Sequence, residues 1–135
     1  MADQPWHELP EEIARVLRPV LDEVADEIIA GVRTIPAYAR PLEGEFGAGI
    51  RAGVREALRH FVDEIEAGAP VPRADVYGAL GRGEMRSGRS LDSLLSAYRV
   101  GARVAWRRFA SVGEAAGLAP ETLYRVAESI FAYID

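Results

Sequence analysis

The sequence predicts an all-α fold: a single-domain helical bundle of about five helices over residues 1–135, with a globin-like arrangement as one candidate. Three observations support it. Apolar residues recur every three or four positions in long segments, which is the period of an amphipathic helix. Prolines stand mostly between these segments rather than within them, where they would break helices. No segment shows the strict alternation of a β-strand.

The first segment runs from residue 10 to residue 32. Pro10 suits the first position of a helix, and Glu11 and Glu12 suit its positive end. Its apolar positions keep a helical period: Leu9, Ile13, Val16, Leu17, Val20, Leu21, Val24, Ile28, Ile29 and Val32. Pro19 interrupts this pattern, because proline cannot donate a backbone hydrogen bond inside a helix. The segment is therefore one kinked helix or two helices that meet.

A connector with two prolines, residues 34–41, separates this segment from a second long helix. That helix carries one apolar stripe and should end near Gly68: Phe46, Ile50, Val54, Leu58, Phe61 and Ile65. A third helix is expected at about 74–87, with Gly88 after its carboxyl end. Ser90 suits the cap of the helix that follows, and Glu84 is expected to lie near Arg99 or Arg103 across this short turn.

The fourth helix has a continuous apolar stripe and is followed by Gly117: Leu91, Leu94, Leu95, Tyr98, Ala102, Ala105, Phe109 and Val112. Pro120 opens a fifth helix, whose apolar pattern reaches Ile134. No glycine, proline or basic last turn follows, so this helix is expected to continue in a longer parent protein. The aromatic residues on or near these stripes are expected in the core: Trp6, Trp106, Tyr98, Phe109 and Tyr124.

Composition and charge narrow the range of functions that the chain could have. A net charge of −5 argues against a dedicated nucleic-acid-binding domain. The absence of cysteine excludes disulfides and thiolate metal sites. Neither a signal peptide nor a membrane-spanning segment is recognisable, so a cytoplasmic location is expected. All sixteen basic residues are arginine, a bias that we attribute to a GC-rich bacterial genome.

A basic ridge is predicted on the fourth helix, where Arg99, Arg103 and Arg107 recur at a spacing of four. It could bind a partner or an anion. The favoured interpretation is a solvated or ion-paired face, with Glu84, Glu114 or acidic residues of the first helix as partners. A helix-turn-helix made by the third and fourth helices is disfavoured, because the fourth helix is filled with apolar residues and the chain is acidic.

No catalytic or metal-binding constellation stands out, so the domain is predicted not to be an enzyme and to hold no cofactor. Glu56 and His60 lie four apart on one helix, but a di-metal bundle needs further ligands on other helices. His60 alone could also be a haem ligand. The carboxylates Asp63, Glu64 and Glu66 are interpreted as a solvated helix face. No nucleophile elbow or cysteine nucleophile is present.

Several segments carry a resemblance to a known family. They are Ile35–Tyr38, Leu58–Val62, Gly81–Glu84, Gly88–Leu91, Ala97–Gly101 and Phe131–Asp135. Together they resemble the helical amino-terminal domain of actinobacterial PucR-class transcription regulators, which is related to the amino-terminal domain of RsbR-type stress-response proteins. In such regulators a DNA-binding domain lies at the carboxyl end, and that part is absent here. The family has no known catalytic residues to carry over.

The resemblance implies a non-catalytic domain for signal input and dimerisation. Its expected partners are a second copy of the chain and the other domains of the parent regulator, without direct nucleic-acid or membrane contact. The fifth helix, with Ile130 and Phe131, is the expected dimer surface, because its apolar stripe is wide. The alternative function is a globin-like sensor that binds haem or another small ligand.

Overall fold

The computed structural model describes residues 4–38, 44–72 and 91–134, and every regular element in these ranges is helical. This confirms the all-helical prediction. The elements are η1 (Pro5–Glu8), α1 (Glu11–Leu17), η2 (Arg18–Val20), α2 (Leu21–Val32), η3 (Pro36–Tyr38), α3 (Gly44–Ala67), α5 (Leu91–Ala115) and α6 (Pro120–Ile134). The helix expected at 74–87 and the turn residues Glu84, Gly88 and Ser90 lie outside the described residues.

The first segment consists of two helices rather than one kinked helix. Pro19 lies in the 3-10 turn η2, which joins α1 to α2. A proline is tolerated in such a turn because its missing N–H would have no partner at a helix start. Arg18 fastens the turn to α3, since its guanidinium donates to Asp63 at 2.8 Å and to Glu66 at 2.6 Å.

Two glycines end the long helices, as the sequence predicts. Gly68 follows α3 with a φ of 66°, and Gly117 follows α5 with a φ of 83°. After α5 the amide of Leu118 donates to the carbonyl of Gly113, and the amide of Gly117 donates to that of Glu114. These two bonds form a Schellman motif, which requires the left-handed conformation at its glycine. The turn allows α6 to start at Pro120 and pack back on α5.

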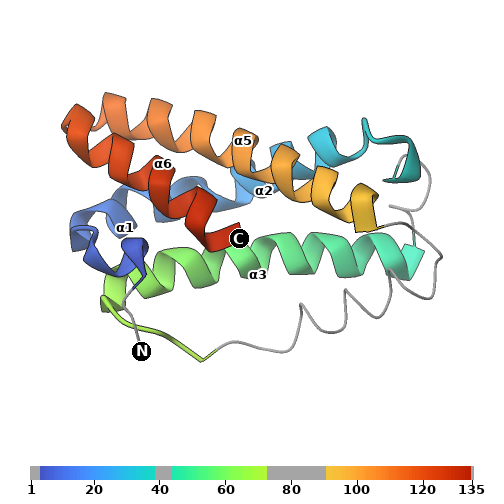
Figure 1. Ribbon diagram of the computed structural model, residues 1–135, viewed down its shortest axis with the longest axis horizontal. Helices are drawn as coiled ribbons and strands as arrows, with labels where there is room; N and C mark the ends of the chain where they lie inside the picture. Colours follow the sequence, from blue (N-terminus) through green and yellow to red (C-terminus); the bar gives the residue numbers. More distant parts are fainter. Residues whose placement is uncertain (1–3, 39–43, 73–90, 135) are drawn as a thin grey trace.

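The helices form an elongated bundle (Figure 1). The long helix α3 lies along one side, and α5 and α6 run antiparallel beside each other across from it. Helix α2 packs against both α3 and α5, while α1 packs against α3, and η1 packs against α3 and α6. Each helix therefore turns its apolar stripe toward at least one neighbour.

The core combines stripes from all the helices. Its largest fully buried side chains include Ile13 and Leu17 of α1, Ile65 of α3 and Phe109 of α5. Burying such a side chain stabilises the fold by about 1.5–3 kcal/mol. This contribution explains why the chain forms a bundle without disulfides.

Two helical glycines have opposite surroundings and give a matched test of the packing. A Cβ on Gly31 of α2 would lie 2.7 Å from Cγ1 of Val100 on α5, whereas a Cβ on Gly49 of α3 would meet nothing within 4 Å. Because the valine side chain is stiff, we expect Gly31→Ala to lower the free energy of unfolding by about 1 kcal/mol.

Gly49→Ala should instead raise the free energy of unfolding by up to about 1 kcal/mol, since alanine is the better helix former. Urea titration of both variants measures these changes. Equal effects of the two substitutions would contradict the close approach of α2 and α5 at Gly31.

Candidate functional site

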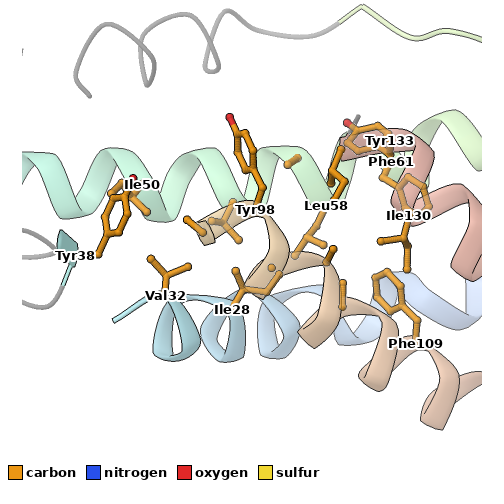
Figure 2. A pocket seen from close by; sticks show the side chains of 17 residues that line it. Ile28, Val32, Tyr38, Ile50, Leu58, Phe61, Tyr98, Phe109, Ile130 and Tyr133 are labelled. Carbon is orange, nitrogen blue, oxygen red and sulfur yellow. The ribbon is translucent and has the colours of Figure 1, made fainter. Parts of the chain in front are cut away.

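An apolar cavity lies between α2, α3, α5 and α6 and has a volume of about 150 Å³. Figure 2 shows side chains from these helices around it, among them Ile28, Leu58 and Phe109. The lining residues are Ile28, Val32, Tyr38, Ile50, Val54, Ala57, Leu58, Phe61, Ala97, Tyr98, Gly101, Ala102, Ala105, Phe109, Ile130, Tyr133 and Ile134. Among these described residues none is charged, and the polar side-chain atoms are tyrosine hydroxyls.

Small residues on α5 account for the hollow. Ala97, Gly101, Ala102 and Ala105 all line the cavity, and their side chains are too short to reach across it. Such apolar walls offer water few hydrogen-bond partners. The cavity is therefore suited to an apolar occupant.

A buried polar cluster surrounds Glu64 of α3, whose residue is 6% exposed. Trp6 Nε1 donates to Glu64 Oε1 at 3.0 Å, and His7 Nε2 lies 2.5 Å from the same oxygen. His60 Nε2 lies 2.7 Å from Glu64 Oε2. The carboxylate is thus enclosed by three N–H groups, from η1 and from its own helix.

The partners of the two imidazoles assign their protons. His60 Nε2 faces the carbonyl of Val71 at 2.8 Å as well as Glu64, so it must be the donor, and Nδ1 faces the Tyr133 hydroxyl at 2.7 Å. His7 Nδ1 accepts from the backbone N–H of Gln4, which leaves Nε2 as the donor to Glu64. Both nitrogens of His60 are therefore engaged, which makes His60 a poor haem ligand.

Two opposing effects act on the Glu64 carboxyl. Burial raises its pKa, while the hydrogen bonds from His7 and Trp6 and the electrostatic attraction of His60 and His7 lower it, and the net effect is a pKa below the ordinary value. The carboxylate form is accordingly the one that the folded domain stabilises.

The cluster corrects one expectation and adds residues that the sequence did not reveal. Glu64 is buried, not part of a solvated helix face, whereas Asp63 and Glu66 do lie at the surface beside Arg18. Trp6 and His7 were not predicted to meet Glu64, because they lie 58 and 57 residues away in the chain. One signal in the sequence could have indicated part of this cluster: the spacing of four between His60 and Glu64, which places both side chains on one face of the helix.

The basic ridge is present on α5. Arg99, Arg103 and Arg107 are exposed, and none pairs with a carboxylate among the described residues. Arg103 and Arg107 line a shallow groove with Gly31 and Thr34 at the end of α2. The neighbouring Arg108 instead binds α2, with Nη2 at 2.6 Å from Glu23 Oε2. Acidic residues of the first segment therefore pair with Arg108 and not with the ridge.

The two predicted interface residues of α6 face different ways. Ile130 is buried in the core at 5% exposure, while Phe131 is 56% exposed. Tyr124, expected in the core, is 70% exposed, and Ile134 is 39% exposed. Together with the half-buried Ala127, the residues Tyr124, Phe131 and Ile134 form an outward stripe, which we call the α6 seam.

Within the described ranges, no helix is long and apolar enough to cross a membrane. In the same ranges no three histidine or carboxylate side chains are arranged to hold a metal ion. The described ranges thus show a helical bundle with an apolar cavity between its helices. The chain belongs to the PucR-like N-terminal domain family, whose model matches residues 6–135. It is thus an amino-terminal domain of the PucR regulator class. Neither the curated proteins nor the solved structures give a significant match.

Proposed function

We propose that this domain is a non-catalytic signal-input and dimerisation module of a PucR-class transcription regulator. It acts in the cytoplasm, next to the other domains of its parent protein, and makes no contact with nucleic acid itself. Family membership supports the regulatory role. The all-arginine basic residues favour a GC-rich, actinobacterial source, and the relation to RsbR-type domains belongs to the same proposal.

The α6 seam is the observation that carries the dimerisation role. Its residues Tyr124, Ala127, Phe131 and Ile134 are spaced three, four and three apart. This is the a/d spacing of a heptad, with which two parallel helices pack along a shared seam. The seam is exposed in the single chain, and contiguous apolar surface on a soluble domain usually marks an interaction site.

A second copy of the chain is the occupant that fits this seam best. A two-fold axis parallel to α6 would place each seam residue beside its own counterpart, so one apolar stripe satisfies both sides. The same symmetry would direct both α6 helices toward the following domains of the regulator. A change in helix packing could then be transmitted along α6.

Sedimentation equilibrium of the 135-residue chain tests the proposal. We expect twice the mass of the 14.7 kDa chain at micromolar concentration. Placing two like charges in the seam with Phe131→Glu should weaken dimerisation at least about 100-fold, since a buried unpaired charge costs several kcal/mol. Tyr124→Glu should act in the same direction.

Leu95→Glu is the matched control, because Leu95 is a 38% exposed apolar residue of α5 that is not part of the seam. It should leave the dimer intact. The proposed interface would be overturned if the wild-type chain were still a monomer at 100 times the micromolar concentration. It would also be overturned if the dimer persisted in both Phe131→Glu and Tyr124→Glu.

A further inference from the structure

We propose that the cavity between α2, α3, α5 and α6 is the ligand site of this domain, and that it takes a small, uncharged, apolar molecule about the size of a single six-membered ring. The inference deepens the proposed signal-input function and rests on it for its regulatory meaning. Binding itself depends only on the cavity, so the two can be tested separately.

The chemistry of the walls defines the ligand class. The seventeen lining residues that the structure describes are apolar, tyrosine or glycine, and none of these carries a charge or an amide. A charged ligand would lose its hydration without gaining a partner, so it is excluded. The buried carboxylate of Glu64 and the imidazole of His60 do not line the cavity, and they are already engaged with one another and with their neighbours.

The size of the cavity sets the size of the ligand. An engineered apolar cavity of about 150 Å³ in another protein stays dry and binds benzene or xenon. The cavity described here has about the same volume, 150 Å³. A haem or a nucleotide is far too large for it, whereas one ring fits.

The opening of the cavity and its link to the dimer surface involve α5 and α6. Most of the wall is buried, but Tyr98 and Ile134 are each 39% exposed and mark an opening to solvent. Figure 2 shows Tyr98 on α5 and Tyr133 on the last turn of α6 at this side of the cavity. Ile134 belongs both to the cavity wall and to the α6 seam, so an occupant contacts the helix proposed to dimerise.

Thermal unfolding with benzene and with benzoate tests the site, because the two probes share one ring and differ in charge. At a benzene concentration 100 times its Kd, the melting temperature should rise by roughly 5–10 °C. Benzoate should cause no rise. Ala57→Leu fills the cavity from α3 and should abolish the benzene shift, while Ala52→Leu on the exposed face of α3 should preserve it.

Ala102→Leu gives a second filled cavity from α5, should Ala57→Leu fail to fold, with Ala110→Leu as its control outside the lining. No shift with benzene near its solubility limit would overturn the proposal. An equal shift in the filled variants would also overturn it, and an equal shift with benzoate would overturn the uncharged class. Sedimentation of the same samples reports on the dimer, so loss of ligand binding and loss of dimerisation are distinguished.

Discussion

Replacing Glu64 by alanine is expected to lower the free energy of unfolding by about 2–5 kcal/mol, because it leaves two buried hydrogen-bond donors without an acceptor. The N–H groups of Trp6 and His7 would lose their acceptor inside the protein, and that of His60 would lose the nearby charge. Urea unfolding followed by circular dichroism measures the change. Glu56→Ala on the same helix is the control, since Glu56 pairs with Arg59 of the same helix among the described residues, and it should cost less than about 1 kcal/mol.

The dependence on pH gives an independent measure of the same carboxylate. The folded state lowers the pKa of Glu64, so its contribution to stability is present above the ordinary value of 4.5 and is lost as the pH falls through the folded value. Glu64→Gln cannot titrate and should lose less stability than wild type below about pH 4.5. The groups that face Glu64 are His7, Trp6 and His60. If the free energy of unfolding fell equally in wild type and in Glu64→Gln below about pH 4.5, the lowered pKa would not belong to Glu64.

Phe109→Ala should lower the free energy of unfolding by about 3–5 kcal/mol, the usual cost of removing a fully buried phenylalanine. Phe109 is 1% exposed and forms part of the cavity wall, so the substitution also enlarges the cavity. The enlarged cavity should bind a two-ring apolar probe such as naphthalene, which should return part of the lost melting temperature.

Leu95→Ala is the control on the same helix and should cost less than about 1 kcal/mol, because Leu95 is already 38% exposed. A loss at Phe109 no larger than the loss at Leu95 would show that Phe109 is not part of the core in solution.

The sequence by itself determined the positions of the longer helices in the described ranges. Helical periodicity located α2, α3, α5 and α6, and Gly68, Gly117 and Pro120 marked their ends closely. These signals are local, since a C-capping glycine or a proline acts through its own backbone dihedrals. Whether Pro19 would kink one helix or separate two was left open, and the packing of α1 and α2 against α3 decided for two.

Only the tertiary structure decided which face of each helix is buried and what lies between the helices. Ile130 and Phe131 are neighbours of similar hydrophobicity, yet one is in the core and the other at the surface, because the position of α5 selects the inner face of α6. Glu64 became a buried acceptor because η1 brings Trp6 and His7 to it from the far end of the sequence. The cavity likewise depends on how closely four helices approach one another, and the apolar periodicity of the sequence does not encode the distance between helices.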